Sequence, residues 1–140
     1  MATIPADFED LFERTTFGIV GTLLPDGSPH LTPIWPDYDG EHVLVNTERG
    51  RQKERNVRGD PSVGLCILDP DDPYRFISIT GEVVEVTEDG AEEHVDRLAR
   101  QYWDVDGHAE RAGEGGPPRV LIKIRPDRIM SSATSKSGGE

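Results

Sequence analysis

The chain has 140 residues, which is enough for one domain with a hydrophobic core and short for two. Its 27 acidic and 15 basic residues give a formal net charge of -12, and only Lys53, Lys123 and Lys136 are lysines. This balance excludes an extended nucleic-acid surface and suits an acidic, salt-adapted protein. No apolar run reaches membrane-spanning length, and the N-terminus has no secretory pattern, so we expect a cytoplasmic protein that does not contact a membrane.

The first third of the chain shows a short helix and then strands. Apolar side chains with helical spacing at residues 8–12 predict the helix. Alternating or apolar runs predict three strands, at residues 17–24, 30–35 and 42–46. The first two should form a hairpin across the turn sequence Pro25-Asp26-Gly27-Ser28. Pro33 cannot donate to a neighbouring strand, so we expect its strand to lie at an edge or to carry a bulge.

The remainder of the chain alternates between helices and strands. We expect helices at residues 51–58 and 91–103, and strands at residues 63–68, 75–86 and 120–124. Gly81, inside the longest strand, indicates a bulge or a close approach of two backbones. Cys66 lies in an apolar run and is predicted to be a small buried side chain. Residues 106–118 read as a loop rich in glycine and charge.

These elements predict a mainly β protein with two or three flanking helices. Six antiparallel strands with short turns favour a small closed or half-open barrel, because closure removes exposed sheet edges. We expect a single domain over residues 1–131 and a flexible tail over residues 132–140, where serine and glycine dominate.

Residues 49–58, called the cationic segment below, are unusual in so acidic a chain. They hold five cationic side chains and one acid, Glu54. Such crowding requires compensation by an anionic ligand or by ion pairs with nearby acids, and the pattern alone leaves both open. On a helix Arg51 and Arg55 share a face, with Lys53 about half a turn away. A strand leading into a cationic helix start is a favourable place for a phosphate.

Other site chemistry is weakly supported. The four histidines show no metal-ligand spacing, and no acid cluster has the pattern of a calcium loop, so we predict no metal site. Neither a dinucleotide glycine fingerprint nor a phosphate-binding glycine loop is present.

Four segments, taken in order, resemble one known family. They are residues 18–23, 25–35, 44–47 and 51–63, and the last contains Arg-x-Lys-x-Arg-Asn followed by Asp-Pro. The set resembles the pyridoxamine-phosphate-oxidase-like superfamily, and more narrowly its flavin- and deazaflavin-dependent oxidoreductases with a six-stranded split β-barrel. The resemblance covers about residues 8–129. It implies a homodimer with cofactor sites at the subunit interface.

The resemblance also implies roles for individual residues. Arg51 and Lys53 would grip the cofactor phosphate, and Arg and Lys are suited to this because they supply a forked donor pair and a point charge. The segment from residue 32 to residue 35 would line the cofactor ring, although Trp35 could equally be a barrel-core residue. Ser78 and Thr80, in a region that matches by pattern and not by motif, would approach from the partner. The implied cofactor-binding residues are Thr32, Pro33, Ile34, Trp35, Thr47, Arg51, Lys53, Asn56 and Ser78.

The implied function is an oxidoreductase that transfers a hydride from reduced F420, or through bound FMN, to a small organic acceptor. The chain is shorter than true pyridoxamine-phosphate oxidases and lacks their C-terminal extension, which favours F420 over the vitamin B6 reaction. No catalytic side chain is predicted, because the hydride chemistry belongs to the cofactor. The alternative is a non-enzymatic flavin or haem carrier, for which His30 and His42 are the candidate axial ligands.

Overall fold

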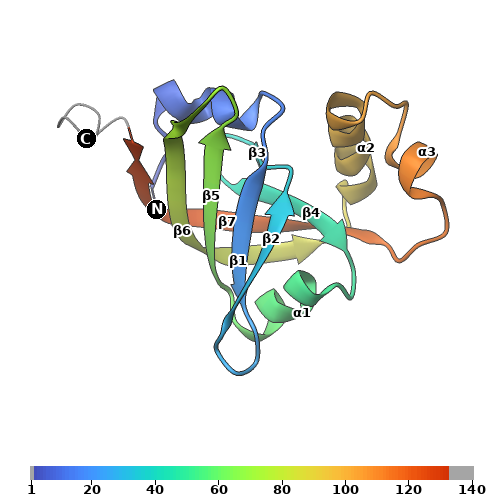
Figure 1. Ribbon diagram of the computed structural model, residues 1–140. Helices are drawn as coiled ribbons and strands as arrows, with labels where there is room; N and C mark the ends of the chain where they lie inside the picture. Colours follow the sequence, from blue (N-terminus) through green and yellow to red (C-terminus); the bar gives the residue numbers. More distant parts are fainter. Residues whose placement is uncertain (1, 133–140) are drawn as a thin grey trace.

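A computed structural model describes residues 2–132. One curled sheet of seven antiparallel strands runs in the order β2-β1-β5-β6-β7-β4-β3 (Figure 1). Its strands are β1 (Gly18–Leu23), β2 (Pro29–Ile34), β3 (Asp37–Tyr38), β4 (Val43–Glu48), β5 (Ser62–Asp69), β6 (Asp72–Thr87) and β7 (Arg119–Ser131). Its helices are the 3-10 helix η1 (Ala6–Phe12), α1 (Gln52–Gly59), α2 (Ala91–Tyr102) and α3 (His108–Ala112). Apart from Ser132, the tail predicted for residues 132–140 lies outside the described residues.

The architecture is the predicted split barrel, with seven strands where six were predicted. The additional strand, β3, is two residues long and begins only two residues after β2 ends. These two strands are the opposite edges of the sheet. The edges are therefore joined by Trp35 and Pro36, and we call this connection the seam. The edge position predicted for the strand containing Pro33 is confirmed.

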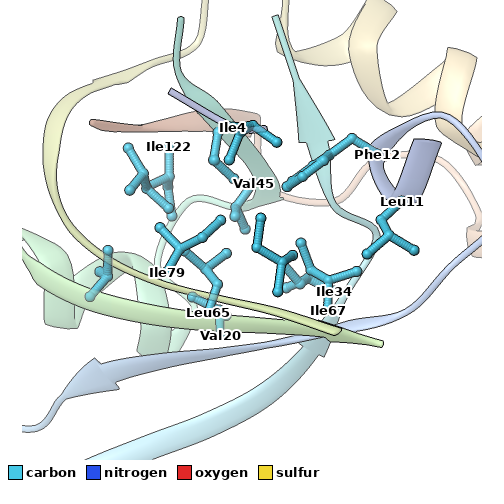
Figure 2. Close-up of a cluster of buried hydrophobic side chains, with 14 of the residues drawn as sticks. Ile4, Leu11, Phe12, Val20, Ile34, Val45, Leu65, Ile67, Ile79 and Ile122 are labelled. Carbon is cyan, nitrogen blue, oxygen red and sulfur yellow. The ribbon is translucent and has the colours of Figure 1, made fainter. Parts of the chain in front are cut away.

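The inside of the curled sheet holds the main core (Figure 2). Alternate residues of the central strands point inward, and Ile67, Ile77 and Ile79 have no accessible surface. Phe8 and Leu11 of η1 add to the same core from the N-terminal side. Each such side chain contributes about 1.5–3 kcal/mol by leaving water, so this layer sets the shape of the barrel.

The long strands meet at a bulge that the sequence had indicated. The register between β6 and β7 shifts at Thr80/Gly81, where Gly81 lies opposite Pro126. A Cβ atom on Gly81 would lie 2.2 Å from the carbonyl oxygen of Arg125, so the close backbone approach is confirmed. Proline is tolerated inside β7 because the bulge disrupts the regular hydrogen-bond ladder there.

Cys66 is less buried than predicted. β5 alternates so that Val63, Leu65 and Ile67 point inward, and Cys66 lies half-buried on the outer face. Its apolar neighbours on both faces of the strand hid the two-residue period. Burial nevertheless raises the pKa of the Cys66 thiol.

Three α-helices lie around the sheet beside the site described below (Figure 1). Helix α2 packs on the outer face of β4 and β7, where Ala91 joins Leu44 and Leu121 in a second small cluster. Helix α1 packs against β1, and the Asn56 side chain donates to the Thr22 hydroxyl at 3.0 Å. Helix α3 lies within the segment predicted to be a loop. Within residues 2–132 no helix is long and apolar enough to cross a membrane.

Candidate functional site

A cavity of about 410 Å³ lies beside the seam, between the sheet edge and the pair α2–α3. This volume is within the range of small-molecule sites. We call it the seam pocket. Its lining comes from β2, β4, β7, the three α-helices and residues that adjoin these elements: Phe17, Pro33, Ile34, Trp35, Asn46, Glu48, Arg51, Lys53, Val95, Leu98, Trp103, His108, Ala112 and Arg119.

One end of the seam pocket is cationic. Lys53 is half-buried there, and no carboxylate of residues 2–132 forms an ion pair with it. Burial and the charges of Arg51 and Arg119 lower the pKa of Lys53 below its usual value. Three positive side chains thus share one pocket wall, and an anion placed among them would relieve their mutual repulsion.

Two other cations of the cationic segment are already compensated by acids. Glu54 is fully buried and accepts from the Gly50 N–H at 2.8 Å and from Arg58 Nε at 2.8 Å. Arg49 contacts Glu54 at 3.4 Å and also pairs with Glu88 at 3.0 Å. A buried carboxylate needs such partners, and supplying them occupies two of the five cations. Ion pairs with acids therefore account for Arg49 and Arg58, whereas Lys53 is placed to meet an anionic ligand.

Arg51 and Arg119 differ in how they are held. Arg51 pairs with Glu48 at 2.9 Å, and its side chain is 61% exposed. Arg119 donates from Nε to the Asn46 side-chain oxygen at 2.8 Å, and no acid of the described chain forms an ion pair with it. Burial is the first cause that lowers the pKa of Arg119, and the charge of Arg51 adds to it.

The seam pocket also has aromatic side chains in and beside its lining. Trp35 stacks on Tyr102 with ring centroids 4.7 Å apart and meets Trp103 edge-on at 4.9 Å. Trp103 in turn stacks on His108 at 5.3 Å, and the Arg111 guanidinium lies 4.9 Å from the Trp103 ring centre. Burial and the charge of Arg119 lower the pKa of His108. These rings form a wall suited to a flat heterocycle.

Five of the nine predicted cofactor-binding residues come together in the seam pocket: Pro33, Ile34, Trp35, Arg51 and Lys53. Trp35, for which a core role was left open, contacts the α2–α3 aromatic cluster.

The other four predicted residues lie elsewhere. Thr32 has a buried hydroxyl without a hydrogen-bond partner among the described residues. Thr47 is 3% exposed and follows the inward-facing Val43 and Val45 on β4. Asn56 bonds to Thr22 and accepts from Gln52 at 2.6 Å. Ser78 lies on the outer face of β6, opposite Cys66.

Several lining residues were missed by the sequence analysis, among them Asn46, Glu48 and Arg119. Asn46 and Glu48 alternate with Thr47 on β4, so the strand period could have identified them. Arg119 reaches the site because β7 pairs with β4, where Arg119 is opposite Glu48. No local motif signals that long-range pairing.

The two histidines considered as haem ligands are not in the seam pocket. Nδ1 of His30 is buried without a partner among residues 2–132, and His42 lies at the turn before β4. The pocket histidine is His108, from α3.

Comparison with known proteins agrees with this arrangement. Residues 4–132 match the family described as pyridoxamine 5'-phosphate oxidase. The chain belongs to the pyridoxamine 5'-phosphate oxidase family. Among curated proteins none matches the sequence. A solved structure titled F420 reductase is 32% identical, with a TM-score of 0.74, over 91% of this chain and 98% of that one.

Two further solved structures extend the family comparison. A conserved hypothetical protein from Mycobacterium tuberculosis is 26% identical, with a TM-score of 0.68, over 94% of this chain and 85% of that one. HupZ from Group A Streptococcus is 21% identical, with a TM-score of 0.66, over 91% of this chain and 93% of that one. At that identity the HupZ likeness shows the fold alone.

The residues of the seam pocket fit the type of ligand that the family fold accommodates. The uncompensated cations of the lining match a phosphate, and the aromatic side chains match a ring system. Strand β2 is a sheet edge, so alternate backbone groups on its free side are available to a ligand.

Proposed function

We propose that this chain is an oxidoreductase that binds F420, or alternatively FMN, in the seam pocket and passes a hydride to a small organic acceptor. The observation that carries the proposal is Lys53, half-buried beside Arg51 and Arg119 with no acid paired to it among residues 2–132. Free positive charge of this kind is costly unless an anion occupies the site.

Each part of the pocket has a role in this proposal. Lys53, Arg51 and Arg119 hold the phosphate, while Trp35 and the free edge of β2 hold the ring. When bound, the cofactor supplies the hydride chemistry. The protein side chains orient the ring, exclude water from one face and neutralise the phosphate. F420 is preferred because the similar structure that is 32% identical is an F420 reductase.

The other four predicted residues have supporting roles in the proposal. The backbone of Thr32 belongs to the ring-binding edge. Asn56 and Thr47 support α1 and the end of β4, which carry the phosphate-binding side chains. Ser78 would contribute only from a second copy of the chain.

We further propose that two copies pair through the outer face of the sheet. Strand pairing aligns Pro33, Ile19, Cys66, Ser78 and Met130 in one row across five strands. Met130 is 69% exposed. Exposed apolar rows of this kind mark interfaces. Because Pro33 belongs both to this row and to the seam pocket, a partner on this face would lie beside the cofactor site.

Ligand binding can be followed with the protein's own fluorescence. The chain has two tryptophans, Trp35 and Trp103, and both line the seam pocket. Titration of the purified protein with F420 and with FMN should quench the fluorescence of both tryptophans. Oxidation of reduced F420 by a panel of small acceptors then separates an enzyme from a carrier. A protein purified yellow with FMN would overturn the F420 preference, and binding of neither cofactor would overturn the proposal.

The dimer is tested independently by light scattering. Met130→Glu should convert dimers to monomers, whereas Val84→Glu, at a 45% exposed apolar position outside the row, should not. A monomeric unmodified protein at micromolar concentration would exclude this interface.

A further inference from the structure

A chain of side-chain hydrogen bonds runs from the second edge of the sheet into the seam pocket. His94 Nε2 lies 2.9 Å from the Asp37 carboxylate, and His94 Nδ1 lies 3.0 Å from the Asn46 amide nitrogen. The Asn46 amide oxygen accepts from Arg119 Nε at 2.8 Å. Arg97 also donates to Asp37, at 2.5 Å. Four separate elements, β3, α2, β4 and β7, are linked in this way.

The orientation of the Asn46 amide follows from its partners. The Ala91 carbonyl can only accept, and the amide atom 2.9 Å from it must therefore be the nitrogen. The amide oxygen then faces Arg119, which can only donate. A flipped amide would place its oxygen against the Ala91 carbonyl oxygen and its nitrogen against Arg119 Nε–H. Only the stated orientation therefore satisfies both contacts.

This orientation sets the protonation of the His94 ring. The second N–H of the Asn46 amide points to Nδ1, which must accept and so carries no proton. The carboxylate of Asp37 accepts from Nε2, which must carry the proton. His94 is 8% exposed, so water does not compete for these atoms. The ring is the neutral Nε2–H tautomer.

Arg119 needs such a restraint because it stands between two cavities of opposite charge. On one side is the seam pocket with Lys53 and Arg51. On the other is a cavity of about 350 Å³ whose lining includes Glu92, Asp96 and Glu114. The charges of Glu92 and of Glu48, which lines both cavities, attract the Arg119 guanidinium. A released Arg119 would turn toward the acids and leave the anion site.

We propose that His94 and Asn46 are positioning residues that hold Arg119 in the seam pocket as the third cation of the phosphate site. The proposal rests on the proposed function for the identity of the ligand. The hydrogen-bonded series Asp37–His94–Asn46–Arg119, called the relay below, can be tested without a ligand. His94 does not line the pocket, so its influence on a ligand passes through Arg119. The relay makes affinity for an anionic ligand depend on a residue that the ligand does not touch.

The ligand test uses replacements of His94 with different hydrogen-bonding ability. His94→Leu removes both bonds, whereas His94→Gln keeps a donor for Asp37 and an acceptor for Asn46. His42→Leu is the matched control, because His42 lies at a turn outside the seam pocket. Dissociation constants for F420 and FMN, from tryptophan quenching, should rise about tenfold in His94→Leu, equivalent to loss of one charge-assisted contact. His94→Gln should recover most of that loss, and His42→Leu should match the unmodified protein.

A double-mutant cycle separates positioning from general stabilisation. Arg119→Gln combined with His94→Leu should bind no more weakly than Arg119→Gln alone, since His94 acts through Arg119. Additive losses in the cycle would overturn the proposal.

A ligand-free measurement keeps the test independent of the proposed function. In nitrogen-15 spectra of the apo protein, His94 should show an unprotonated Nδ1 and a protonated Nε2. The Arg119 Nε–H signal should be protected from exchange and should lose that protection in His94→Leu. A protonated Nδ1, or an Arg119 signal unchanged by the substitution, would refute the relay even if cofactor binds. If neither cofactor binds but these signals appear as stated, the proposed function fails and the relay stands.

Discussion

Lys53→Met is the most informative single substitution. Methionine keeps most of the length and apolar stem of lysine but removes the charge. In the protein without ligand, Lys53 is half-buried near Arg51 and Arg119. Burial and these two positive charges destabilise the charged form of Lys53. The substitution should therefore affect stability and ligand affinity in opposite directions.

The expected sizes follow from these contacts. A hydrogen bond to a charged group contributes about 1.5–3 kcal/mol, so loss of the Lys53–phosphate contact should weaken F420 or FMN binding roughly ten- to hundredfold. Repulsion between partly solvated charges is about 0.2–1 kcal/mol. Its relief should raise the Tm of the apo protein by about 1–4 °C for a chain of this size.

Lys123→Met is the matched control. Lys123, on β7, pairs with Glu85 at 3.4 Å and lies outside the seam pocket. Its loss should lower stability by up to about 1 kcal/mol and leave affinity unchanged. Affinity is measured by tryptophan quenching with calorimetry as a check, and Tm by circular dichroism. If Lys53→Met lowers the Tm by several degrees and binds ligand as before, Lys53 is structural and the phosphate assignment is wrong.

Three further outcomes are expected. Gly81→Ala should destabilise the protein by about 3 kcal/mol or more in guanidinium titrations, because its Cβ would meet the Arg125 carbonyl; a near-neutral effect would contradict the bulge. Hydrogen bonds from Arg14 and Arg75 lower the pKa of Asp69 from 3.8 to about 2, so its stabilisation is complete above about pH 4 and is lost as the pH falls toward 2. Urea titrations across this range should show a smaller acid-induced loss in Asp69→Asn than in the unmodified protein. Raising KCl from about 0.1 to 2 M should increase the Tm of this chain, whose net charge is -12, and should weaken phosphate binding. A Tm and a binding affinity that both rise or both fall would contradict the charge assignment.

The regular strands were predictable from the sequence, and the short or interrupted ones were not. Strands β1 and β5 follow hydrophobic patterns bounded by turn residues, and the structure places them within a residue or two of the prediction. Strand β3 is too short to show any period. The predicted end of β7 near Ile124 was wrong, because Pro126 reads as a stop and is accommodated only by the bulge at Gly81.

Some residues of the candidate site were likewise predictable from local sequence, and others were not. The cationic segment signalled Arg51 and Lys53 because their spacing is local. The buried Glu54 could not be foreseen as the partner of Arg49 and Arg58, since burial depends on how α1 docks. Arg119 is 66 residues from Lys53 in sequence, and only strand pairing brings them to one pocket.

The seam has a consequence for how the pocket can change. Elsewhere, neighbouring strands are kept at a fixed spacing by hydrogen bonds, but at the seam the two edges are tied by the covalent chain at Trp35 and Pro36. The gap there depends on the length of one short connection and not on strand register. Inserting or deleting a residue at this connection would therefore resize the pocket while every ladder pair of the sheet stays in place. Ligand size can be altered in such a barrel without redesigning its core.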